Sequence, residues 1–155
     1  QDIFTRDGIG SLINSTEGVL FVESSVLSND GTYKAFSLSD GTTSNTIRFY
    51  TTPTLNQLAI RVTVSGSHEF NVVFTLTDLT VLNKMALKYK ANDFALWVNG
   101  VEVKTSTSGN TYTANTLNSL QFDRGDGADD FYGKVKQLQV YNTALTDTQL
   151  AALTS

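Results

Sequence analysis

Short segments in which apolar and polar residues alternate recur along the chain, and turn-forming residues separate them. The alternation is clearest at Ile47 and Phe49, at 58–64 and at 70–76, with Pro53 between the first two segments. A period of two is typical of half-buried antiparallel strands. Many short strands with turns between them predict an all-β protein, an antiparallel β-sandwich.

Local signals place individual turns and ends. Asn99-Gly100 stands between the apolar run 94–98 and the run 101–103, and this dipeptide is the strongest short-range signal of a type I′ hairpin. In the last strand Val135 and Leu138 are three residues apart, which breaks the period of two and predicts a β-bulge at Lys136–Gln137.

A short C-terminal helix should follow this last strand. Thr146 is in the position of a capping residue, and Gln149 stands three residues later, as in a capping box. We expect the inward face of the sandwich to include Phe21, Leu38, Phe49, Ile60, Val62, Phe74, Leu87, Leu96, Val98, Leu120, Phe122, Val135, Leu138 and Val140.

Composition narrows the class of protein. The 155 residues, of which 40% are hydrophobic, are enough for one domain with its own core, so we treat 1–155 as a single unit. The net charge of −4, without a cluster of Lys or Arg, argues against nucleic acid as a partner. No apolar run approaches the roughly 20 residues that span a bilayer, so no membrane insertion is expected. Because Gln1 is not a native start, we expect a segment of a longer protein.

Three segments in the second half resemble a known family: 84–89, the hairpin segment 94–100 with its Val-Asn-Gly, and 131–153. Together they are similar to concanavalin A-like, laminin-G-like jelly-roll domains. The resemblance implies jelly-roll topology with one short C-terminal helix. The residues of these segments resemble those of modules in phage tail fibres and other virion adhesins, and also those of modules on polysaccharide-degrading enzymes. It implies an extracellular or virion-surface location and, for a tail fibre, a homotrimer.

Catalytic members of this superfamily carry groups that this chain lacks. The glucanase relatives need paired carboxyl groups about 5 Å apart, whereas the Glu residues here are isolated in sequence, at Glu17, Glu23, Glu69 and Glu102. The lone histidine, His68, follows Gly66-Ser67 and is not part of a Gln-x-His strand as in the lyase relatives. We therefore expect no enzymatic activity and interpret His68 as a residue at the exposed start of a strand.

An acidic loop offers the best candidate for a metal site. Asp123, Asp126, Asp129 and Asp130 supply hard oxygen ligands of the kind that Ca²⁺ prefers, and glycines between them allow tight turns. Arg124 partly neutralises the loop. The alternative is a solvated turn in which Asp side chains cap backbone amides.

A sugar site needs an aromatic ring against the pyranose and polar groups for its hydroxyls. Suitable rings are Tyr50, Tyr112, Tyr132 and Trp97, of which Trp97 is interpreted as core packing. We expect the ligand-binding residues to be Tyr132, Asp126, Arg124, Asn110 and Tyr112, on the loops 105–115 and 123–132 at one rim.

These observations predict a non-catalytic module that recognises a cell-surface or matrix glycan, as the receptor-binding or decorating domain of a phage tail fibre or virion surface protein. Two alternatives stay open at this point. One is a structural or oligomerisation domain without glycan binding, and the other is a carbohydrate-binding appendage of a polysaccharide-degrading enzyme.

Overall fold

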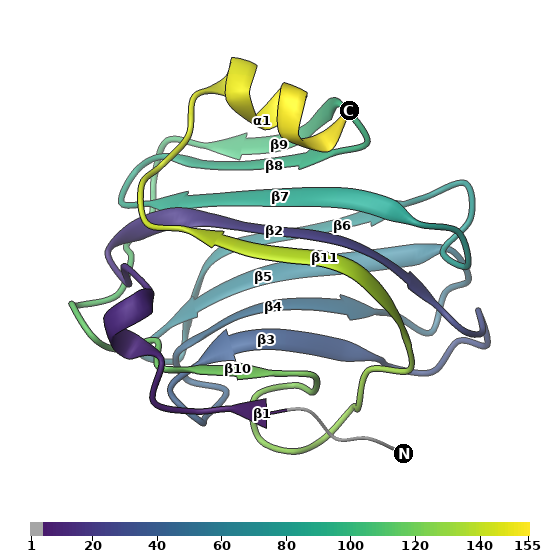
Figure 1. The fold of residues 1–155 in the computed structure, drawn as a ribbon, viewed down its shortest axis with the longest axis horizontal. Coiled ribbons are helices and arrows are strands. Elements are labelled where there is room, and N and C mark those ends of the chain that lie inside the picture. Colours follow the sequence, from purple (N-terminus) through teal and green to yellow (C-terminus); the bar gives the residue numbers. More distant parts are fainter. Residues whose placement is uncertain (1–4) are drawn as a thin grey trace.

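Two antiparallel sheets lie face to face in the computed structural model, which describes residues 5–155 (Figure 1). The six-stranded sheet has the order β1 (Thr5–Arg6), β10 (Ser119–Gln121), β3 (Ala35–Ser39), β4 (Thr46–Thr51), β5 (Gln57–Val64) and β6 (Ser67–Thr75). The five-stranded sheet has the order β11 (Gly133–Tyr141), β2 (Glu17–Val26), β7 (Asn83–Lys90), β8 (Phe94–Val98) and β9 (Val101–Ser106). This arrangement confirms the predicted antiparallel β-sandwich.

Two helices complete the described fold. A 3₁₀ helix, η1 (Gly10–Leu12), precedes β2, and α1 (Asp147–Thr154) lies over the outer face of the five-stranded sheet near β8 and β9 (Figure 1). The Thr146 hydroxyl accepts a hydrogen bond from the backbone N–H of Gln149, and the Gln149 side chain accepts from the Thr146 N–H, so the predicted capping box is present. In the described part of the chain, no helix has the length and apolar character to cross a membrane.

The core lies between the sheets because alternate residues of facing strands point inward. Phe49 is fully buried, and its ring stacks on Phe36 with 5.0 Å between centroids. Phe131 meets Phe36 edge-on at 5.6 Å. Every predicted core residue except one belongs to this cluster or packs against it.

Phe21 is the exception and corrects the prediction. It is buried on the outer face of the five-stranded sheet, in a second cluster with Leu150 of α1. Trp97 packs against the same cluster, so its interpretation as a packing residue is confirmed. Strand β2 therefore carries apolar residues on both faces, and helix α1 covers those on the outer face.

The predicted hairpin turn and the predicted β-bulge are both confirmed. Asn99 and Gly100 have φ values of 48° and 80°, the positive pair that a type I′ turn requires. The register between β11 and β2 shifts between Val135 and Gln137, which places the β-bulge at the predicted position.

Candidate functional site

Two arginines lie side by side on the outer face of the six-stranded sheet. Arg48 of β4 is directly opposite Arg61 of β5 in the strand register. Their neighbours along each strand are buried, so alternation directs both guanidinium groups outward. The ring of Tyr50 lies 4.5 Å from Arg48 Cζ and 5.6 Å from Arg61 Cζ, which are cation–π distances.

The acidic loop brings a third arginine over the same face. Arg124 forms ion pairs with Asp126, at 2.8 Å, and with Asp129, at 3.4 Å. The loop can lie close to the sheet because residue 125 is glycine: a Cβ there would be 3.3 Å from the Thr42 carbonyl oxygen and 3.4 Å from Ser37 Oγ. Arg124 is thus largely neutralised within its own loop, whereas Arg48 and Arg61 form no ion pair with a carboxylate of residues 5–155.

Two adjoining hollows share these three arginines. The first, which we call the tyrosine hollow, has a volume of about 340 Å³ and is lined by Tyr33, Arg48, Tyr50, Arg61, Arg124 and Asp129. The second, the histidine hollow, has a volume of about 350 Å³ and is lined by Thr43, Ser44, Arg48, Arg61, Thr63, Gly66, His68 and Arg124. Both are in the size range of small-ligand sites.

Polar atoms without partners lie under this surface. Among the described residues, Arg48 Nε, Ser37 Oγ and Thr46 Oγ1 are buried and form no hydrogen bond. Ser37 is opposite Arg48 in the register of β3 and β4, and Thr46 is two residues from Arg48 on β4, so the three share one patch of the outer face. These atoms are shielded from solvent, so they make the patch beneath the arginines polar without themselves reaching a ligand.

The electrostatics favour an anion. Burial lowers the pKa of Arg48 and the neighbouring Arg61 guanidinium lowers it further, although the phenolic hydroxyl group of Tyr50 acts in the opposite direction. A lowered arginine pKa means that the positive charge costs free energy in this environment. A carboxylate between Arg48 and Arg61 would remove that cost through charge-assisted, bidentate hydrogen bonds.

The structure brings only part of the predicted ligand set to this site. Arg124 lines both hollows, and Asp126 is its ion-pair partner. Tyr132 is 45% exposed but lines neither hollow, and its carbonyl accepts a hydrogen bond from Leu27 N–H. Asn110 also lines neither hollow, and its backbone N–H donates to Glu69 Oε2.

Tyr112 requires a correction. Only 3% of this residue is exposed, and it belongs to the core between the sheets. Its ring is therefore buried in the core and is not offered to a ligand.

The predicted calcium residues engage other partners. Asp123 is buried and its Oδ1 accepts hydrogen bonds from the backbone N–H groups of Gly125 and Gly127. Asp126 and Asp129 face Arg124, and Asp130 is half-buried in the same loop. Within residues 5–155, no group of three His, Asp or Glu side chains is arranged to hold a metal ion. Calcium binding is a prediction that stays untested, and Asp123 shows the capping of backbone amides that the alternative prediction describes.

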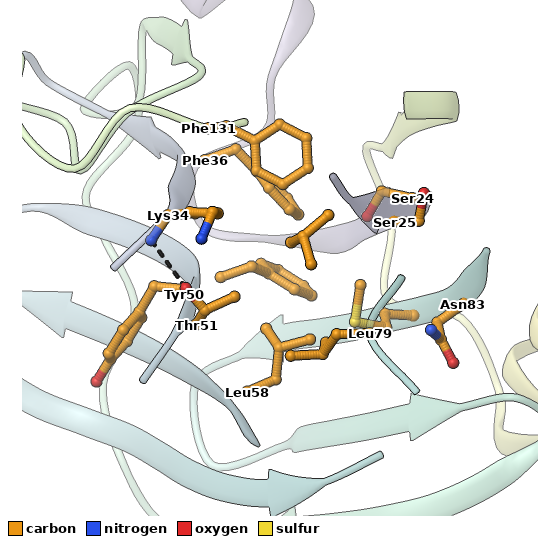
Figure 2. Close-up of a pocket in the computed structure, with 13 residues that line it drawn as sticks. Ser24, Ser25, Lys34, Phe36, Tyr50, Thr51, Leu58, Leu79, Asn83 and Phe131 are labelled. Atoms are coloured by element: carbon orange, nitrogen blue, oxygen red, sulfur yellow. Dashed lines mark hydrogen bonds between the residues drawn. The ribbon is translucent and has the colours of Figure 1, made fainter. Parts of the chain in front are cut away.

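A third, enclosed space lies between the sheets, where Lys34, Phe36, Leu58 and Phe131 line it (Figure 2). Its volume is about 20 Å³. Room of that size accommodates about one water molecule, so this space cannot hold a sugar ring.

Sequence reasoning missed Arg48 and Arg61. A signal existed: both stand at polar positions of strongly alternating strands that flank the turn around Pro53. Pairing these strands as a hairpin with Thr51 opposite Leu58 places the two arginines side by side. Nothing local specifies that register, so neither residue stands out by itself.

Comparison with known proteins gives one family and a consistent fold. A laminin-G-type family model, described as the concanavalin A-like lectin/glucanases superfamily, matches residues 20–151. No curated protein sequence matches the chain.

Solved structures with the same fold include the CBM40 module of the Ruminococcus gnavus IT-sialidase bound to α2,6 sialyllactose, with a TM-score of 0.74, 16% identity, and 98% coverage of both chains. The leech intramolecular trans-sialidase matches with a TM-score of 0.73 and 18% identity, and 98% of this chain aligns with 28% of that one. The receptor-binding domain of a botulinum neurotoxin, mosaic serotype C/D, matches with a TM-score of 0.74 and 7% identity, over 97% of this chain and 39% of that one.

Proposed function

Because the chain belongs to the concanavalin A-like lectin/glucanase superfamily, we propose that it is a non-catalytic module that binds an acidic glycan through the arginines of its six-stranded sheet. One observation carries this proposal. Arg48 and Arg61 lie side by side without a carboxylate partner among residues 5–155, over buried polar atoms that form no hydrogen bond.

The tyrosine hollow suits one terminal acidic sugar. Two guanidinium groups bind a carboxylate in the bidentate geometry that a lysine cannot supply. Tyr33 is 48% exposed and its ring lies 6.4 Å from that of Tyr50. These rings offer apolar surface to the C–H face of a sugar, and Asp129, which also pairs with Arg124, lines the same hollow beside the sugar's hydroxyls.

Sialic acid is the acidic sugar that we propose. The Ruminococcus gnavus module with the same fold was solved with α2,3 and with α2,6 sialyllactose. The identity of 16–17% shows a common fold only, so the support for sialic acid in this chain comes from the arginines.

The biological setting is a separate proposal. Several proteins with this fold are sialidases or modules of sialidases, which supports a carbohydrate-binding appendage of a glycan-degrading enzyme. The phage tail fibre, the homotrimer and the extracellular or virion-surface location stay predictions.

The test measures affinity for sialyllactose, with lactose as the neutral control, by titration calorimetry. We expect Arg48→Ala to weaken sialyllactose binding at least about tenfold, because it removes charge-assisted hydrogen bonds. Arg48→Lys should recover little, since the planar fork is lost.

Lys134→Ala is the matched control, because it removes a positive charge from an exposed position of β11 on the other sheet. Its affinity should equal that of the wild type. Equal affinity of Arg48→Ala and the wild type would refute the assignment of the site.

A further inference from the structure

The histidine hollow differs in charge from the tyrosine hollow. Both share the three arginines, but Asp129 lines the tyrosine hollow, whereas no carboxylate lines the histidine hollow. The histidine hollow adds His68 and the hydroxyl groups of Thr43, Ser44 and Thr63. It is therefore the more positive of the two and has donors but no aromatic wall.

His68 is held at the edge of this hollow. It is opposite Thr63 in the register of β5 and β6, and its Nδ1 lies 3.1 Å from Thr63 Oγ1. This contact orients the ring and leaves Nε2 on the side away from Thr63. Thr63 is in turn opposite Thr46, whose buried Oγ1 is one of the atoms without a hydrogen-bond partner.

One sugar does not use both hollows. A terminal acid that places its carboxylate on Arg48 and Arg61 and its ring on the tyrosines occupies the tyrosine hollow, and a second space of about 350 Å³ is left beside the same arginines. The two spaces adjoin at the three arginine side chains that line both of them. A neighbouring sugar of the same glycan would reach it.

Resting on the proposed function, we propose that the histidine hollow is a second subsite, which binds the anionic group of the adjacent sugar. The module then prefers glycans that carry acidic sugars at two neighbouring positions over glycans that carry one. Arg61, which forms no ion pair with a carboxylate of residues 5–155, supplies the charge on this side, and the hydroxyl groups of Thr43 and Ser44 supply donors.

The protonation of His68 makes this preference depend on pH. Although His68 is exposed, desolvation by its surroundings and the positive charges of Arg61 and Arg48 lower its pKa below the ordinary value of 6.5. Arg124 is the other charged group of the hollow. The Asp40 carboxylate engages Thr42 and Asn45, and that of Glu69 accepts from the Asn110 N–H.

The direction of the effect follows from linkage. A bound anion favours the charged imidazole and raises the pKa of His68 from its lowered value, so binding takes up a proton as the pH falls. Affinity for the doubly acidic glycan therefore increases on acidification, while that of the singly acidic glycan stays nearly constant.

The experiment compares sialyllactose with a disialyl-lactose whose two sialic acids are adjacent, by calorimetry at pH 7.5 and pH 5.5. The wild type should bind the disialyl compound about tenfold more tightly at pH 7.5, well above the twofold that two equivalent ends would give. At pH 5.5 the advantage should grow about fivefold further.

Two variants separate the subsite from the arginine site. His68→Gln should bind sialyllactose as the wild type does and lose only the additional gain at pH 5.5. Ser44→Asp places a carboxylate in the exposed wall of the histidine hollow, so it should abolish the disialyl preference at both pH values. Thermal unfolding of each variant establishes that it is folded.

Each result decides between the proposals. Equal affinity of the wild type for both compounds, or a preference that Ser44→Asp leaves intact, would overturn the second subsite while the arginine site stands. Failure of both compounds to bind folded wild-type protein would instead overturn the proposed function itself.

Discussion

The position of Arg48 within its strand holds its side chain on a rigid backbone. Its neighbours Ile47 and Phe49 are fully buried in the core, so the backbone at this point is held by packing on the opposite face of the sheet. The guanidinium group therefore projects from a rigid base beside Tyr50. A binding group whose backbone is already ordered loses less conformational entropy when a ligand arrives.

Gly125 determines where Arg124 lies, and this gives a residue-scale prediction. Its φ is 103°, and a Cβ would press on the Thr42 carbonyl oxygen at 3.3 Å. We expect Gly125→Ala to lower the free energy of unfolding by about 1–3 kcal/mol and to weaken acidic-glycan binding, because the loop must move away from the sheet. Urea denaturation and calorimetry measure the two effects.

Gly127→Ala is the matched control in the same loop. Gly127 also has a positive φ, 82°, but nothing lies within 4 Å of the position that a Cβ would take. This variant should show backbone strain of about 1 kcal/mol with unchanged glycan affinity. Equal affinities of the two variants would contradict the role assigned to the position of Arg124.

At the scale of elements, helix α1 completes a second apolar layer. Leu150 is fully buried against Phe21 on the outer face of the five-stranded sheet, and Trp97 packs at the same place. The capping box at Thr146 begins α1 a few residues after β11 ends at Tyr141. A strand followed by a capped helix thus folds back over its own sheet.

Leu150→Ala tests this layer. Truncating a fully buried leucine costs about 2–5 kcal/mol, so the midpoint of thermal unfolding should fall. The single tryptophan, Trp97, reports the local change, and its emission should shift to longer wavelength as the helix loosens. Thr148→Ala, at an exposed position of the same helix, should change neither quantity; an unshifted emission in Leu150→Ala would argue against this packing.

For the whole molecule, the net charge has the same sign as the proposed ligand, but the charges near the site have the opposite sign. The net charge is −4, yet the hollows of the six-stranded sheet gather three arginines. Charges on the rest of the surface are screened beyond about 10 Å at ordinary ionic strength. The local arginines therefore dominate what an approaching carboxylate experiences.

Calcium is also tested at the scale of the whole molecule, because an ion that binds only the native state raises its stability by mass action. Asp126 and Asp129 are paired with Arg124, and Asp123 accepts from backbone amides. We expect 2 mM Ca²⁺, at about the level that extracellular modules bind, to leave the midpoint of thermal unfolding as it is in EGTA. A rise of several degrees would establish the calcium site instead.

The sequence by itself determined the features that depend on neighbouring residues. Alternation with a period of two indicated the strands and most of the core, Asn99-Gly100 indicated the hairpin, and Thr146 with Gln149 indicated the start of the helix. Each rests on contacts or torsion angles within a few residues, so the local pattern is sufficient.

Tertiary structure decided the site. Arg48 and Arg61 become neighbours only through the register of β4 and β5, and Arg124 joins them from a loop more distant in sequence. Tyr112 was predicted to be exposed and Phe21 to face the space between the sheets. The tertiary structure instead buries Tyr112 in the core and places Phe21 under α1. The physical reason is that these neighbours come together through long-range strand pairing and packing. The residues next to each of them in sequence do not specify which distant residue it will contact.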